Sequence, residues 1–288
     1  MKNGVGMMSQ NISTKEGMFE AADGFQLFER WWVPEGETKA VVVIVHGLAE
    51  HSGRYSHVAK RLNEDGYAVY TFDLRLHGRS GGAKAFVKSF DDYLADLDVF
   101  LARVREKEPQ KPLFLLGHSM GGTISALFAI TRKPDIRGLL LSAAALKMGD
   151  DISPILISLS GIIGSILPKL PTVKLDSGAI SKDPEVIKKY DTDPLNYRGG
   201  TPARTGAEIV RATRIIQERM EEINVPILIM HGTADRLANI EGSKELNERA
   251  RSADKTLKLY EGLYHEILNE PEKEEVMDDI IEWMNSHC

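Results

Sequence analysis

Long apolar runs separated by helical patterns are the feature that most constrains the fold of this chain. Residues 40–45 read Ala-Val-Val-Val-Ile-Val without polar alternation, which is typical of a strand buried on both faces of a parallel sheet. Amphipathic helical spacing follows such runs, for example at residues 93–104. Strands that alternate with helices in this way predict a mostly parallel central sheet flanked by helices. Comparable apolar runs occur at residues 67–72, 113–116, 138–141, 227–230 and 256–260.

Two departures from this alternation indicate how the chain is organised. Near the start, residues 17–22 and 25–33 alternate around a turn at Asp23-Gly24, which predicts an antiparallel hairpin. Between residues 150 and 224 the strand-like runs stop, prolines accumulate and helical periodicity survives only in pieces. We therefore predict an α/β core of residues 1–149 and 225–288. Residues 150–224 are predicted to form a helical cap inserted after the sixth strand.

Bulk composition bounds the partners and the location. The 288 residues carry a formal net charge of −6, which argues against nucleic acid as a partner. The single cysteine, Cys288, allows no disulfide within the chain, as is typical of a reducing compartment. No apolar stretch has the roughly 20 residues needed to span a bilayer, and the N-terminus lacks the apolar core of a secretory signal. We expect a cytoplasmic protein, with at most peripheral contact to membranes.

A sharp turn that can carry chemistry follows the apolar run at residues 113–116. It reads Gly117-His118-Ser119-Met120-Gly121, and a helical pattern follows. A strand-to-helix turn of this kind strains the central residue, so its neighbours two positions away on either side must be nearly free of side chains. The helix N-terminus also adds positive potential where an oxyanion would form. The segment resembles the nucleophile elbow of α/β-hydrolases; a structural glycine-rich turn is the alternative.

A serine hydroxyl needs a base, and the base needs an acid that orients it. In α/β-hydrolases the acid and then the histidine follow the nucleophile, each on a loop after a late strand. Residues 227–230 lead to Asp235, and residues 256–260 lead to His265. We therefore predict Ser119, Asp235 and His265 as a catalytic triad.

Other roles are open to these residues. Asp235 could cap a helix near Leu237, and His265 could be a surface histidine. Asp193 or Glu266 could supply the orienting carboxylate instead. However, Asp193 lies in the predicted cap and Glu266 adjoins the histidine, so neither is well placed to reach the far ring nitrogen.

The tetrahedral intermediate of ester hydrolysis needs two aligned N–H donors. The first is expected from the backbone of Met120, directly after the nucleophile. The second is expected from Leu48, because Gly47 allows a sharp turn after the strand at residues 40–45. His46 is expected to pack below this loop without a catalytic role.

Metal and cofactor chemistry finds little support in the sequence. His265 lacks the second histidine of a zinc-binding helix, and His46 and His51 have no third ligand at a suitable spacing. The strand ends carry no phosphate-binding or dinucleotide fingerprint. We therefore expect neither a metal nor an organic cofactor.

Longer motifs resemble the monoacylglycerol lipase and lysophospholipase group of α/β-hydrolases over nearly the whole chain from about Gly17. The matching motifs are residues 46–55 in the oxyanion loop, Asp193-Pro-Leu in the cap, residues 232–237 in the acid loop and residues 258–265 in the histidine loop. One motif departs from the group, because Leu76 stands where the group usually has glycine. This puts the conformation of the turn at residues 75–80 in doubt.

The resemblance implies roles for particular residues. It implies that Ser119, Asp235 and His265 form the triad and that Leu48 and Met120 are the oxyanion donors. It also implies that residues 150–224 roof an acyl pocket.

A stripe of apolar residues in the predicted cap bears on the substrate. Either the stripe packs the cap onto the core, or part of it lines an apolar tunnel or touches a lipid surface. Its faces lack the Lys and Arg of a strong membrane binder, so we expect only weak, transient membrane contact. The members of the stripe are Ile152, Ile155, Leu156, Leu159, Ile162, Ile163, Ile166 and Leu167.

We expect the reaction to be hydrolysis of a small apolar acyl ester, preferably a monoacylglycerol, through an acyl-enzyme. A general carboxylesterase and a lysophospholipase are alternatives on the same fold. A non-catalytic receptor that uses the cap pocket for a small ligand is a more distant alternative.

Overall fold

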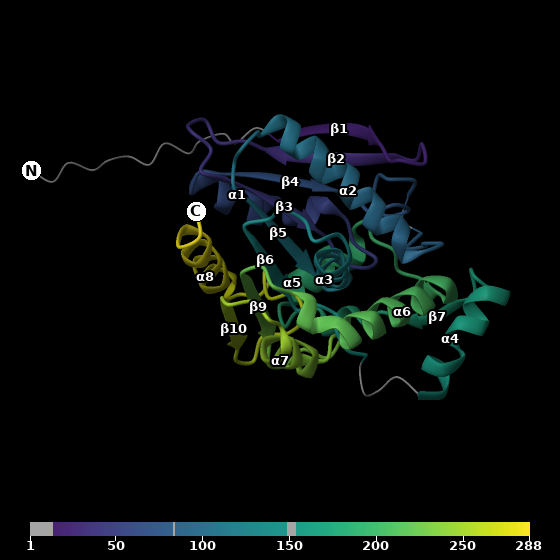
Figure 1. The fold of residues 1–288 in the computed structure, drawn as a ribbon. Helices are drawn as coiled ribbons and strands as arrows, with labels where there is room; N and C mark the ends of the chain where they lie inside the picture. Colours follow the sequence, from purple (N-terminus) through teal and green to yellow (C-terminus); the bar gives the residue numbers. More distant parts are fainter. Residues whose placement is uncertain (1–13, 83, 149–153) are drawn as a thin grey trace, which may run out of the picture.

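An eight-stranded sheet forms the centre of the molecule (Figure 1), with the strand order β1-β2-β4-β3-β5-β6-β9-β10. The computed structural model describes residues 14–82, 84–148 and 154–288. The hairpin of β1 and β2 is antiparallel, and β2 also pairs antiparallel with β4. The other neighbouring pairs are parallel, so the predicted α/β-hydrolase architecture is confirmed. The strands are β1 (Lys15–Glu20), β2 (Gln26–Trp32), β3 (Ala40–Val45), β4 (Tyr67–Phe72), β5 (Leu113–His118), β6 (Gly138–Ser142), β9 (Ile227–Gly232) and β10 (Lys255–Tyr260).

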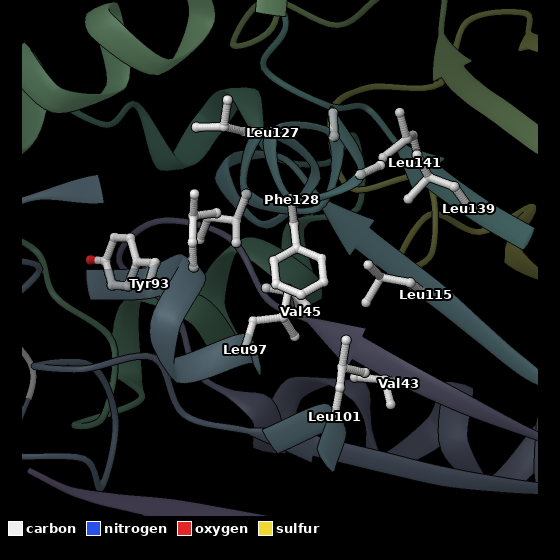
Figure 2. Packing of buried hydrophobic residues seen from close by; sticks show 14 of the residues in the cluster. Val43, Val45, Tyr93, Leu97, Leu101, Leu115, Leu127, Phe128, Leu139 and Leu141 are labelled. Atoms are coloured by element: carbon white, nitrogen blue, oxygen red, sulfur yellow. The ribbon is translucent and has the colours of Figure 1, made fainter. Parts of the chain in front are cut away.

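Both faces of the sheet are covered, which is why its central strands contain no polar alternation. Successive residues of β3 point to opposite faces, so that Val43 and Val45 enter one apolar cluster and Val42 and Ile44 enter the other. Figure 2 shows the first cluster, in which Phe128 lies over the sheet. The helices that contribute to the first cluster are α2 (Phe90–Lys107), α3 (Met120–Arg132), α6 (Ala203–Arg219) and α7 (Ile240–Arg249), and those of the second are α1 (Ser56–Glu64) and α8 (Lys273–Asn285).

The segment between β6 and β9 leaves the sheet and is mostly helical. It also contains a short antiparallel pair, β7 with β8, which the sequence pattern of this segment did not predict. Strands this short, with prolines at their ends, give no apolar run that a sequence pattern could reveal. The elements are α4 (Pro154–Ile166), β7 (Pro171–Lys174), α5 (Pro184–Thr192), β8 (Gly200–Pro202) and α6 (Ala203–Arg219); the short 3₁₀ helices of the chain are η1 (Ser52–Tyr55), η2 (Ser177–Ala179) and η3 (Met220–Glu222).

Helix α6 belongs to both parts of the molecule. Toward its N-terminus it packs against α4, where a Cβ on Gly164 would lie 2.9 Å from the Cβ of Ala207. Further along, Ala212 and Ile216 are buried in the core cluster. The division of the chain at residues 149/150 and 224/225 therefore stays a prediction.

The parallel strands bring their carboxyl ends to one edge of the sheet. The residues that follow β3, β5, β9 and β10 are the ones predicted to carry chemistry, and they meet at this edge. No helix in the described parts of the chain is long and apolar enough to cross a bilayer.

Candidate active site

Ser119 lies between β5 and α3 in a strained backbone conformation. Its φ is 53° and its ψ is −120°, a combination that residues with side chains rarely adopt. A Cβ on Gly117 would lie 2.5 Å from the carbonyl oxygen of Gly121, and a Cβ on Gly121 would collide with the carbonyl oxygen of Val45. Both flanking positions therefore require glycine, because backbone of the turn itself and of the neighbouring strand β3 leaves no room for a Cβ.

His265 and Asp235 are joined by a hydrogen bond of 2.8 Å between Nδ1 and Oδ2. The same carboxylate lies 3.0 Å from Nε2 of His231. Its Oδ1 accepts the N–H groups of Leu237 at 2.7 Å and Ala238 at 3.0 Å. Asp235 thus caps a turn and also holds the imidazole, so these two roles are not exclusive. The helix α7 that follows has its own cap, Asn239.

The ion pair shifts the pKa values of both partners. Burial disfavours the charged form of each, but nearby opposite charges and hydrogen bonds together outweigh burial. The pKa of Asp235 lies well below its usual range, since its burial is opposed by His265 and by the bond to His231. The pKa of His265 is raised, since its burial is opposed by the Asp235 carboxylate. An ionised Asp235 requires the proton on Nδ1, which leaves Nε2 of the neutral ring free to accept a proton.

Ser119 and His265 line the same pocket. Across the described ranges, no hydrogen bond joins the Ser119 hydroxyl to the imidazole. The ring of His118 lies 4.9 Å from that of His265 between centroids, and its Nδ1 contacts the carbonyl oxygen of Ser142 at 3.1 Å. Burial, reinforced by the nearby His265, lowers the pKa of His118 to about 4. The neighbouring ring is therefore neutral at neutral pH and does not compete for Asp235.

Leu48 and Met120 line this pocket as well. Within the part of the chain that the structure describes, neither backbone N–H has an acceptor in the protein. Met120 is the first residue of α3, where helix geometry leaves N–H groups unpaired. A Cβ on Gly47 would lie 3.2 Å from the Cβ of Ser119, so the predicted oxyanion loop abuts the predicted nucleophile. Two free donors thus lie beside the Ser119 side chain.

A buried ion cluster holds the oxyanion loop, and sequence patterns alone did not single it out. Glu50 accepts the Gly47 N–H at 2.6 Å and an N–H of Arg54 at 2.7 Å. Arg54 also donates to both carboxylate oxygens of Glu266, at 2.6 and 2.7 Å. Burial would raise the pKa of Glu50, but Arg54, two nearby histidines and the Gly47 N–H together outweigh it and lower that pKa to about 2. Arg54 therefore ties the oxyanion loop to the loop that carries His265.

The alternative acids are engaged elsewhere. Asp193 lies 3.0 Å from Nε2 of His51, and Glu266 binds Arg54. His46 is completely buried, and its Nε2 accepts the Leu74 N–H at 2.9 Å, which fits the expected packing role.

The turn that contains Leu76 keeps a left-handed backbone despite the missing glycine. Leu76 has a φ of 58°, and its N–H donates to the carbonyl oxygen of Ser80 at 2.7 Å. Its own carbonyl oxygen accepts the N–H groups of Lys84 and Ala85, both at 3.0 Å. These three bonds offset the strain that the side chain introduces.

The pocket has a volume of about 500 Å³ and is largely apolar. The members of the predicted apolar stripe have different environments: Ile163 lines the pocket, whereas Ile162 and Ile166 are 59% and 71% exposed. Packing onto the core therefore does not account for the exposed members, and Ile152 lies outside the described residues. The apolar residues that the segment between β6 and β9 contributes to the pocket include Ile163, Val173, Leu175, Ala207, Ile209 and Val210. No group of three metal-ligating side chains occurs in residues 14–82, 84–148 and 154–288.

Known proteins resemble this chain over most of its length. Residues 36–272 match the family described as serine aminopeptidase, S33. A monoacylglycerol lipase from Mycolicibacterium smegmatis is 36% identical over 94% of this chain and 97% of its own length. A monoglyceride lipase from Mus musculus is 34% identical over 92% of this chain and 87% of its own. The crystal structure of the monoacylglycerol lipase of Paleococcus ferrophilus superposes with a TM-score of 0.81 at 31% identity, covering 96% of this chain and all of the other.

Proposed function

Because the chain belongs to the serine aminopeptidase S33 family and is a monoacylglycerol lipase-like serine hydrolase, we propose that it hydrolyses monoacylglycerols through Ser119, Asp235 and His265. The observation that carries the proposal is the Asp235–His265 hydrogen bond together with the placement of His265 and Ser119 in the lining of one pocket. This arrangement supports general-base activation of a serine.

The proposed cycle uses only groups of the chain and water. His265 Nε2 takes the proton of the Ser119 hydroxyl while Oγ attacks the ester carbonyl carbon. The N–H groups of Leu48 and Met120 stabilise the oxyanion. Collapse of the intermediate breaks the bond to the alcohol, which leaves as glycerol with the proton from His265. Water then attacks the acyl-enzyme by the same route and releases the fatty acid.

The shape of the pocket favours a single acyl chain. Its volume of about 500 Å³ is in the range of small-ligand sites. Its apolar walls suit a hydrocarbon chain, and one chain with a small head group fits such a volume better than three chains. This is why we favour a monoacylglycerol over a triacylglycerol.

Contact of the cap with lipid surfaces is part of the same proposal. Ile162, Ile166 and Leu167 are exposed on and after α4, close to the pocket-lining Ile163. They would bring the pocket to a membrane that supplies the substrate, in a weak and reversible way. A cytoplasmic location peripheral to membranes fits this mode of access.

Ser119→Ala tests the proposal. Hydrolysis of a monoacylglycerol should fall by about three to six orders of magnitude, since the triad acts as a unit, and a fluorophosphonate probe should label only the unaltered protein. Circular dichroism should show an unchanged fold. Retention of ester hydrolysis by purified Ser119→Ala would show that another residue is the nucleophile.

A further inference from the structure

Glu270 is a fully buried carboxyl group outside the triad. In the described part of the chain it forms no ion pair, and the nearby Lys182 side chain binds Glu272 instead. A buried carboxyl group is costly unless hydrogen bonds replace its water. Its position five residues after His265 therefore calls for an explanation.

The bonds to Glu270 come from two separate segments. Its Oε1 accepts the Tyr264 N–H at 2.9 Å, directly before His265. The Lys182 N–H lies 3.2 and 3.3 Å from its two oxygens, and the Ser181 hydroxyl donates at 3.0 Å. Ser181 is completely buried as well. Glu270 thus joins the segment between η2 and α5 to the histidine loop.

The peptide on the other side of His265 is held by the same segment. The Glu266 N–H donates to the carbonyl oxygen of Ile180 at 2.8 Å. Both backbone N–H groups that flank His265 are therefore anchored to residues 180–182, one directly and one through Glu270. The imidazole must hold Asp235 and also face Ser119, so small displacements of this backbone would misalign the base.

We propose that Glu270 is a positioning residue that fixes the backbone of His265 to the segment at residues 180–182. The proposal rests on the proposed function, because it assumes that His265 is the base. It makes the alignment of the base depend on the contact between the histidine loop and residues 180–182, which directly follow the pocket-lining Asp176 and Ala179.

Two substitutions test this positioning role of Glu270. In Glu270→Gln one of the two acceptor oxygens becomes an NH2 donor and the charge is lost, so the hydrogen bonds that the carboxylate accepts from the Tyr264 N–H, the Lys182 N–H and the Ser181 hydroxyl cannot all be kept. We expect kcat to fall about 10- to 100-fold with KM changed less than about threefold, since alignment and not the acyl pocket is affected. Ser181→Ala removes one donor, and we expect a smaller loss, about 3- to 10-fold in kcat. Glu272→Gln is the matched control; it lies two residues away, binds only the Lys182 side chain, and should keep kcat within about twofold.

All rates are normalised to active sites titrated with a fluorophosphonate, so that loss of folded protein does not imitate loss of alignment. A kcat within about twofold of that of the unaltered protein in both variants would overturn the proposed positioning role, whatever their melting temperatures. If Glu270→Gln does not fold, Ser181→Ala decides by the same criterion. The proposed function fails separately, if Ser119→Ala remains active.

Discussion

The turn that carries Ser119 and helix α4 form opposite kinds of environment around one pocket. Every residue of β5 is buried, and an added methyl group at Gly121 would collide with backbone. In α4, Ile162 and Ile166 are largely exposed, and a Cβ at Gly161 would meet nothing within 4 Å. Ser119 and Ile163 nevertheless line the same cavity.

This difference indicates that the two regions suit different functions. Close packing around the turn leaves one geometry available, which suits groups that must be aligned for chemistry. Exposure on the outer face of α4 leaves side chains free to vary there, which suits groups that select and admit substrate. We therefore expect substitutions in the turn to affect kcat and stability, and substitutions in α4 to affect chain-length preference and lipid access.

The largest effect should come from one added methyl group in each region. Gly121→Ala should unfold the protein or abolish its activity, since the collision is with backbone that cannot move aside; we expect a loss of about 3 kcal/mol or more in the free energy of unfolding. Gly161→Ala, the matched control in α4, should stabilise by about 0.5–1 kcal/mol, because alanine favours the helix. Chemical denaturation measures both. Equal changes in the free energy of unfolding would show that the two regions do not differ in packing.

Asp235→Asn should lower kcat about 10²- to 10⁴-fold and should also change the pH dependence. His265 acts as a base only when neutral, so kcat/KM rises with pH through its pKa, which the ion pair raises. Without the carboxylate charge, burial remains and lowers that pKa, so the rising limb should move to lower pH while the plateau falls. A pH profile of kcat/KM for both proteins measures this. A limb that stays in place would show that the ion pair does not set the pKa of the base.

Substitutions at two adjacent positions of α4, one in the pocket and one on the surface, should have different effects on acyl-chain preference. Ile163→Trp should shift preference toward shorter acyl chains by about 10-fold in kcat/KM, since it fills the apolar cavity. Ile162→Trp, whose side chain points to solvent, should leave the chain-length profile unchanged. A panel of monoacylglycerols of increasing chain length compares them. Similar profiles would mean that Ile163 does not bound the acyl site.

The smallest effect concerns the exposed apolar surface. Ile166→Ser should weaken binding to phosphatidylcholine vesicles about three- to tenfold, from the loss of buried apolar area. Hydrolysis of a water-soluble short ester should not change. Vesicle co-sedimentation and an ester assay measure the two quantities. Unchanged sedimentation would argue against a lipid contact at this position.

Much of the fold could be predicted because the strands of a covered sheet must be apolar throughout. The run at Ala40–Val45 is an example, and the pattern also placed Ser119, Asp235 and His265 on loops at one sheet edge. The pair of β7 and β8 could not be predicted, since backbone pairing of short segments leaves no pattern in the side chains.

Long-range polar contacts were equally hidden. The 4-residue spacing of Glu50 and Arg54 hints at an ion pair, but nothing local connects Arg54 to Glu266, 212 positions later. Likewise, Glu270 joins residues 181 and 182 only because the chain folds back on itself. The left-handed Leu76 shows the reverse case, in which the group pattern predicted glycine and hydrogen bonds preserved the turn without it.

Helix α6 has a mechanical consequence for substrate traffic. Ala212 and Ile216 of α6 are embedded in the core, and Ala207 of the same helix packs against Gly164 of α4. Helices α4 and α6 therefore cannot move together as a rigid body away from the sheet without pulling core side chains out of place. Widening of the entrance must then come from sliding or local fraying of α4. An engineered disulfide between α4 and α6 should accordingly slow the hydrolysis of esters with long acyl chains and leave the hydrolysis of small soluble esters unchanged.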